Sequence, residues 1–179
     1  MRAPIIVLTG PPGTGKTTVA QLLADHFDRS AVVQGDDFFR YLRAGRIEPW
    51  RPESHDQNGM VMDITAQATA GYATAGLATV LEGIVGPWFI DPLAAHWIGS
   101  DVHYLVLEAP RQVARDRVVA RGDDPDRVGL DKMHAEFERA AVAPRHRLDA
   151  TSSPTDVAHA AITVIRDHTA LWTPTQHPA

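Results

Sequence analysis

The chain has no cysteine among its 179 residues, which excludes disulfide bonds, thiolate zinc sites and cysteine nucleophiles. A cysteine-free composition is typical of a reducing compartment, and the sequence therefore predicts a cytoplasmic protein. The apolar run near the beginning, residues 5–8, is too short for the core of a signal peptide. Because no stretch approaches the roughly 18 apolar residues of a membrane span, we expect no membrane association.

Lysine is almost absent, since only Lys16 and Lys132 occur and the other basic residues are arginines. The net charge is −5, so no global positive field would gather nucleic acid, and this counts against a nucleic-acid partner. The nine histidines show no metal-ligand spacing. With 44% hydrophobic and 22% charged residues, the composition is that of one globular domain spanning residues 1–179.

Short β-branched apolar runs alternate with longer segments of helical periodicity. This alternation predicts an α/β fold in which a five-stranded parallel sheet lies between two layers of helices. The expected strands are 5–9, 31–33, 78–81, 102–107 and 147–150. The expected helices are about 16–27, 38–43, 59–74, 91–97, 110–121, 131–141 and 154–168. Residues 45–59, rich in proline and glycine, are expected to be irregular.

A phosphate-binding loop follows the first strand, because residues 10–17 have the pattern of glycine, four residues, Gly-Lys and then Ser or Thr. Backbone N–H groups and the start of the next helix would hold the phosphates of ATP. Lys16 would contact the β- and γ-phosphates, and Thr17 would hold Mg²⁺ through its hydroxyl. The predicted nucleotide-binding residues of this loop are Gly10, Pro11, Pro12, Gly13, Thr14, Gly15, Lys16, Thr17 and Thr18.

Acidic residues follow the second and third expected strands, at Asp36, Asp37 and Glu82. Ligands of an open parallel sheet bind beyond the carboxyl ends of its strands, so these acids should share one cleft with the loop. We expect Asp36 to accept the hydroxyl proton of an acceptor, with Asp37 as the alternative, although either can instead cap the next helix. Glu82 is expected to hold Mg²⁺ or contact the acceptor, unless it only ends a buried strand.

The chain resembles the P-loop kinases of small molecules in three features. They are the phosphate-binding loop, the Gly35-Asp36 pair after the second expected strand, and the arginine-rich helix after the fourth. Gluconate kinase, adenylylsulfate kinase and chloramphenicol phosphotransferase are the relatives it is similar to. The resemblance implies a three-layer P-loop NTPase fold, ATP with Mg²⁺, and an acceptor-side segment at about 38–75. Gly35-Asp36 matches the first two families, whereas the third has its aspartate one position later, at Asp37.

The resemblance also implies a short lid at about 117–131 that closes over ATP. Arg117 and Arg121 share one helix face just before the polar break at 122–126, and we expect both to bind nucleotide, with Arg121 also catalytic. The alternative is a solvated arginine face paired with neighbouring acids. On the acceptor side we expect Phe39, Arg40 and Trp50 to bind the acceptor together with Asp36 and Glu82, unless the aromatic residues serve packing alone.

The sequence thus predicts an ATP-dependent kinase that transfers the γ-phosphate to a hydroxyl of a small molecule, acting as a monomer or homodimer. Two alternatives remain. One is a polynucleotide 5′-kinase, because such kinases also carry consecutive aspartates after the second strand. The other is a nucleotide-dependent switch protein that hydrolyses ATP slowly and signals through a partner, although 179 residues leave little room for partner surfaces.

Overall fold

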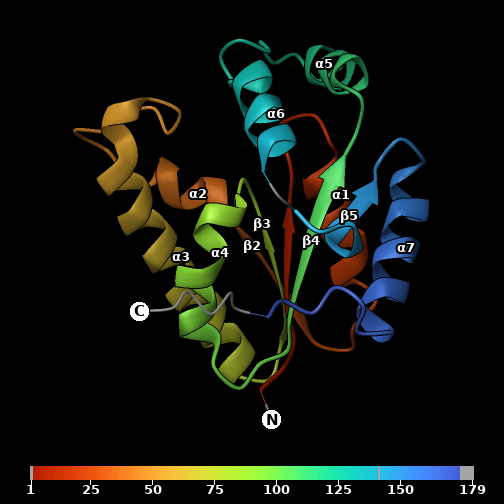
Figure 1. Ribbon diagram of the computed structural model, residues 1–179. Helices are drawn as coiled ribbons and strands as arrows, with labels where there is room; N and C mark the ends of the chain where they lie inside the picture. Colours follow the sequence, from red (N-terminus) through yellow and green to blue (C-terminus); the bar gives the residue numbers. More distant parts are fainter. Residues whose placement is uncertain (1, 141, 174–179) are drawn as a thin grey trace.

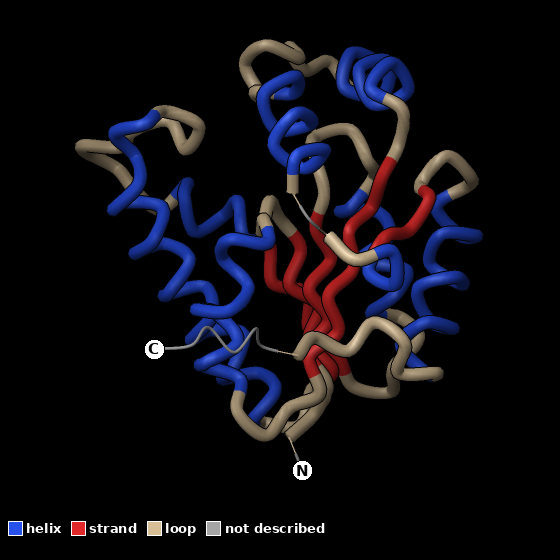
Figure 2. Tube along the Cα trace, in the orientation of Figure 1, coloured by secondary structure: helices blue, strands red, loops and turns tan. Residues whose placement is uncertain are grey.

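The computed structural model describes residues 2–140 and 142–173 and has a parallel sheet at its centre (Figures 1 and 2). The predicted five-stranded sheet is confirmed, and its strand order is β2-β3-β1-β4-β5. The strands are β1 (Ile5–Thr9), β2 (Ser30–Gln34), β3 (Ala78–Glu82), β4 (Val102–Glu108) and β5 (Arg147–Asp149). β1 therefore lies in the middle, paired with β3 on one side and β4 on the other.

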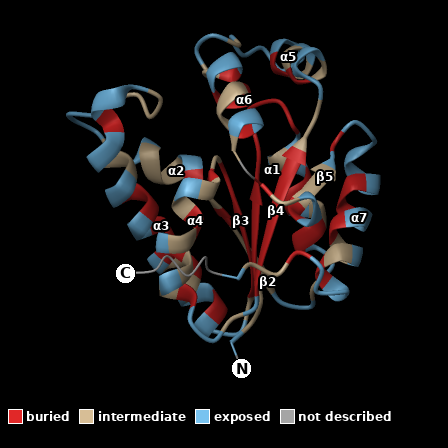
Figure 3. Cartoon of the chain, viewed as in Figure 1, coloured by how far each residue is buried: buried red, intermediate tan, exposed pale blue. Residues whose placement is uncertain are grey.

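Two apolar cores form because successive side chains of a strand point to opposite faces of the sheet. Ile5 and Val7 of β1 belong to the core beneath α3 (His55–Thr74) and α4 (Pro87–Ala94). Ile6 and Leu8 belong to the core beneath α1 (Lys16–Ala24) and α7 (Pro154–Arg166). Figure 3 shows the buried strands between these exposed outer helix faces, which is the predicted three-layer arrangement.

Three further helices lie at the carboxyl ends of the strands, where the sequence places the site. They are α2 (Gly35–Arg40), α5 (Arg111–Ala120) and α6 (Leu130–Arg139). Short 3-10 segments occur at Pro52–Ser54, Ala95–Trp97 and Pro144–His146. In the part of the chain that the structure describes, no helix combines the length and apolar character needed to cross a membrane.

Several helices begin earlier than their periodicity predicts. α2 begins at Gly35 rather than residue 38, so Asp36 and Asp37 occupy its first turn, where acidic side chains complement the helix dipole. α3 begins at His55, so residues 55–59 are helical rather than irregular, and α4 begins at Pro87 rather than residue 91. Proline suits the first turn of a helix because that turn leaves its backbone N–H groups unpaired. The expected end of α6 at Ala141 lies outside the described residues.

The last described residues complete the sheet where β5 does not reach. Leu171 forms an antiparallel bridge with His103 of β4. The backbone N–H of Trp172 donates to the Val102 carbonyl at 2.7 Å, and the indole Nε1 donates to Asp91 Oδ1 at 2.8 Å. This segment thereby covers part of an otherwise open strand edge.

Candidate active site

The loop between β1 and α1 has the tight backbone that its glycines predict. Gly10 and Gly13 have φ values of +141° and +83°, which disfavour any residue with a side chain. A Cβ at Gly13 would lie 2.3 Å from the Ala114 carbonyl oxygen of α5, and one at Gly10 would lie 2.4 Å from the Leu107 carbonyl oxygen. The loop is thus packed against β4 and α5 at distances that only glycine allows.

Lys16 lies at the start of α1, and its ammonium folds back over the loop. Nζ donates to the carbonyl oxygens of Gly10 at 2.8 Å and Pro11 at 3.0 Å. Burial lowers the pKa of Lys16, while the negative charges of Glu82 and Asp36 oppose that shift. The structure therefore brings the lysine and two of the predicted acids into one electrostatic group.

Glu82 ends β3 and is only 6% exposed. Thr17 Oγ1 donates to Glu82 Oε1 at 3.3 Å, which places a hydroxyl and a carboxylate side by side. Burial raises the pKa of Glu82, and Lys16 opposes that rise. Oxygen ligands of this kind suit Mg²⁺, which is commonly bound by one or two protein groups, substrate phosphates and water. Among the described residues no cluster of three or more His, Asp or Glu offers an alternative metal site.

Asp36 and Asp37 occupy different environments although they are neighbours in the first turn of α2. Asp37 Oδ1 pairs with Arg40 Nη1 at 2.6 Å. Asp36 is exposed and acts electrostatically on both Lys16 and Glu82. Neither side chain caps α2 through a hydrogen bond to the backbone of the helix. Of the two acids, Asp36 has the stronger electrostatic link to the phosphate loop.

The two predicted lid arginines contact different partners. Arg117 Nη1 donates to the Ala150 carbonyl at 2.9 Å and so connects α5 to the loop that follows β5. Arg121 Nε pairs with Asp123 Oδ2 at 2.5 Å, and its charge helps to lower the pKa of Lys16. Of the two predicted lid arginines, Arg121 is therefore the one whose positive charge acts on Lys16 of the phosphate loop.

Phe39, Arg40 and Trp50, which are predicted to bind the acceptor, have different surroundings. Phe39 lies half-buried on α2, and Arg40 forms an ion pair with Asp37. Trp50 lies against the lid, because a Cβ at Gly129 would be 3.7 Å from its indole, and its carbonyl accepts a hydrogen bond from Lys132 Nζ. Thr18, predicted to bind nucleotide, is exposed on α1.

Sequence reasoning missed His134 of α6, which is 4% exposed. Burial lowers the pKa of its imidazole, and the neighbouring backbone of Pro12 in the phosphate loop opposes that shift. Helical periodicity places His134 on the buried face of α6 with Leu130 and Phe137, but nothing in the sequence indicates which element that face meets.

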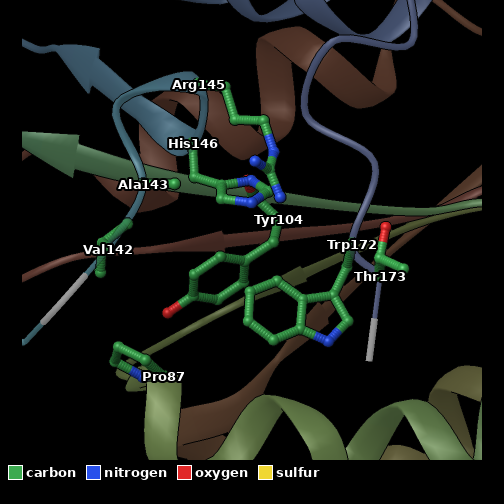
Figure 4. Close-up of a pocket in the computed structure, with 8 residues that line it drawn as sticks. All are labelled: Pro87, Tyr104, Val142, Ala143, Arg145, His146, Trp172 and Thr173. Carbon is green, nitrogen blue, oxygen red and sulfur yellow. The ribbon is translucent and has the colours of Figure 1, made fainter. Parts of the chain in front are cut away.

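Two hollows lie near the beginning of α4. An open groove of about 430 Å³ is lined by Trp88, Glu136, Arg139 and Ala140, between α4 and α6. A smaller pocket of about 180 Å³ is lined in part by the rings of Tyr104, His146 and Trp172 (Figure 4). None of the predicted site residues lines either hollow, but the groove adjoins α6, the helix whose His134 lies beside the phosphate loop.

The fold and this site define a P-loop nucleotide-binding protein of the kinase type. The chain belongs to the AAA domain family, whose pattern matches residues 6–142. It is also similar to a cytidylate kinase from Archaeoglobus fulgidus, with 25% identity over 138 residues that cover 75% of this chain and 72% of the relative.

Solved structures agree on the fold. A sugar kinase from Janibacter sp. HTCC2649 superposes with a TM-score of 0.70 at 22% identity, covering 96% of this chain and 99% of that one. A gluconokinase from Sinorhizobium meliloti 1021 has a TM-score of 0.66 at 15% identity, with 93% of each chain covered. The predicted resemblance to P-loop small-molecule kinases is confirmed.

Proposed function

We propose that this protein is an ATP-dependent kinase that transfers the γ-phosphate to a hydroxyl of a small molecule. The observation that supports it most is the grouping of Lys16, Glu82 and Asp36 around the phosphate loop. Phosphoryl transfer needs charge neutralisation at the phosphates and a carboxylate that accepts the proton of the attacking hydroxyl. One acid of the group is buried beside Thr17, and the other is exposed toward an incoming molecule.

Each of these residues has a role in the proposed reaction. Lys16 and the backbone N–H groups of the loop hold the phosphates of ATP. Thr17 and Glu82 would hold Mg²⁺, which when bound neutralises phosphate charge. Asp36 takes the proton of the acceptor hydroxyl while the hydroxyl oxygen bonds to the γ-phosphorus. In the same step the bond between the γ-phosphorus and the bridging oxygen breaks, and ADP is released. Arg121 adds positive charge beside the phosphates, and Arg117 positions the loop after β5.

The groove between α4 and α6 is the proposed place of the acceptor. Trp88 offers an aromatic face that is 47% exposed, while Glu136 and Arg139 offer one charge of each sign. A small polar molecule with a ring or apolar face matches such a lining. The proposed site therefore includes Trp88 and Arg139 in addition to Asp36, Phe39 and Arg40.

The test is ADP release by the purified protein with Mg²⁺ and ATP against a panel of sugars, sugar acids, nucleosides, aminocyclitols and hydroxylated antibiotics. We expect at least one compound to raise ADP release well above the level without acceptor, with a phosphorylated product detected by mass. Lys16→Ala should abolish this release. If no hydroxyl compound stimulates the wild-type protein while a partner protein does, the kinase proposal is wrong and the switch reading stands.

Similarity to a cytidylate kinase favours one further acceptor class, a nucleoside monophosphate whose phosphate oxygen, instead of a hydroxyl, would attack the γ-phosphorus. The panel should therefore include CMP, UMP and AMP. It should also include an oligonucleotide with a 5′-hydroxyl, because labelling of that end would identify the polynucleotide kinase activity that the net charge of −5 counts against.

A further inference from the structure

Trp50 joins two parts of the molecule that are far apart in the sequence. It lies in the acceptor-side segment, residues 38–75, and contacts the lid, residues 117–131, at Gly129. Its carbonyl accepts a hydrogen bond from Lys132 Nζ, one residue beyond the lid. Figure 1 shows the beginnings of α3 and α6 at the same end of the sheet.

The loop that carries Trp50 is fixed to α3 by side chains of the first helical turns. Gln57 binds Ile47 twice, accepting from its backbone N–H at 2.8 Å and donating to its carbonyl at 2.7 Å. Asn58 Nδ2 and Ser54 Oγ donate to the Pro49 carbonyl at 2.7 and 2.8 Å. Because these bonds hold the residues just before Trp50, the indole is carried by a defined extension of α3.

On the other side of the contact, α6 is fixed to the nucleotide-binding half. His134 lies beside the Pro12 backbone of the phosphate loop, and Asp131 pairs with Arg115 of α5 at 2.7 Å. Gly129, which precedes α6, has a φ of +64° and no side chain, so the indole can approach its backbone. The element that Trp50 contacts is thus the same one that contacts the phosphate loop.

We propose that Trp50 and Lys132 are positioning residues that couple the acceptor-side segment to the lid, so that ATP and acceptor are enclosed together. This inference rests on the proposed kinase function, and it concerns regulation of the same site. A kinase must keep water from taking the γ-phosphate, and enclosure of both substrates by joined elements meets that need. Loosening the contact therefore increases transfer to water relative to transfer to the acceptor.

The contact itself is tested without any acceptor, because the chain has no cysteine and accepts one label at a chosen place. Asp126→Cys in the lid is labelled with bimane, a fluorophore that a nearby tryptophan quenches. We expect quenching in the chain with Trp50, loss of quenching in W50F, and partial loss in Lys132→Met. Equal bimane emission in all three proteins, each shown to be folded by its thermal melt, would overturn the inference whatever the reaction is.

Coupling is tested by the ratio of ADP released without acceptor to ADP released with it. We expect Lys132→Met to raise this ratio about fivefold, the factor associated with one typical hydrogen bond, and W50A to raise it further. The matched control is Arg166→Met on α7, whose exposed side chain pairs with the adjacent Asp167 and whose loss should leave the ratio unchanged. A contact confirmed by bimane together with an unchanged ratio in both variants would overturn the coupling while leaving the proposed kinase function intact.

Discussion

At the scale of single residues, the two adjacent aspartates show how neighbours acquire different roles. Asp37 pairs with Arg40 and acts electrostatically on Glu82, whereas Asp36 acts on both Lys16 and Glu82. The ion pair occupies a carboxylate oxygen of Asp37 that would otherwise be available to an acceptor hydroxyl. The geometry therefore favours Asp36 over Asp37 as the proton acceptor of the proposed reaction.

Asp36→Asn is expected to reduce the rate of phosphate transfer about a hundredfold or more, as expected for loss of a proton acceptor, while ATP affinity changes little. Steady-state ADP release and ATP binding by calorimetry measure the two effects. Asp37→Asn is the matched control and should reduce transfer only slightly, because its exposed ion pair with Arg40 contributes little energy. The reverse order of effects would assign the role to Asp37.

The protonation of Glu82 should determine how the Mg²⁺ concentration needed for activity changes with pH. Its raised pKa means that the carboxylate gains a proton at a higher pH than an ordinary glutamate does, and a protonated carboxyl is a poor partner for Mg²⁺. The Mg²⁺ concentration for half-maximal ADP release should therefore rise as pH falls toward the raised pKa. Glu82→Gln should raise this concentration at every pH and flatten its dependence on pH; an unchanged requirement would contradict the assigned role.

At the scale of elements, the phosphate loop is held by α5 and α6 as well as by the β1–α1 connection. Gly13 approaches the Ala114 carbonyl of α5, and Pro12 lies beside His134 of α6. Arg115 and Arg111 of α5 pair with Asp131 and Glu138 of α6 at 2.7 and 3.0 Å. α5 and α6 therefore support the phosphate loop.

Gly13→Ala should lower the free energy of unfolding by about 3 kcal/mol or more, because the new Cβ would overlap the α5 backbone. Gly15→Ala is a matched control with a similar φ of +88° but open space around it, and should cost only about 1 kcal/mol of backbone strain. Urea unfolding of both variants measures the difference. Equal losses would show that α5 does not pack on the loop in solution.

At the scale of the whole molecule, the buried His103 of β4 makes stability depend on pH. His103 is 1% exposed on β4, and its ring centroid lies 5.6 Å from that of His168. Burial lowers the pKa of His103 to about 4, with a further contribution from His168 and a small opposing one from Asp101. The folded protein therefore binds fewer protons than the unfolded chain between about pH 6.5 and 4.

Stability should accordingly be intact above about pH 6.5 and decrease by about 2 to 3 kcal/mol as pH falls toward 4. Urea unfolding at a series of pH values measures this dependence. In His103→Leu the slope between these pH values should be markedly smaller, since the titrating group is gone. A slope that is the same in both proteins would mean that other groups account for acid sensitivity.

Much of the fold follows from the sequence because its signals are local. The apolar runs of β1 and β4 and the glycine pattern before Lys16 depend on neighbours in the chain, so period and spacing predict them. The starts of α2, α3 and α4 were predicted too late, since proline and acidic residues at a first turn resemble loop residues until a helix is seen to follow.

The sequence by itself determined the phosphate loop, the parallel sheet and the edge at which the acids gather, because these depend on residue spacing and on the geometry of parallel strands. Only the tertiary structure decided that Asp37 pairs with Arg40, that Trp50 lies on Gly129 and that His134 reaches Pro12. The Trp50 and His134 contacts join residues more than seventy positions apart, and their partners follow from packing, which no local pattern encodes.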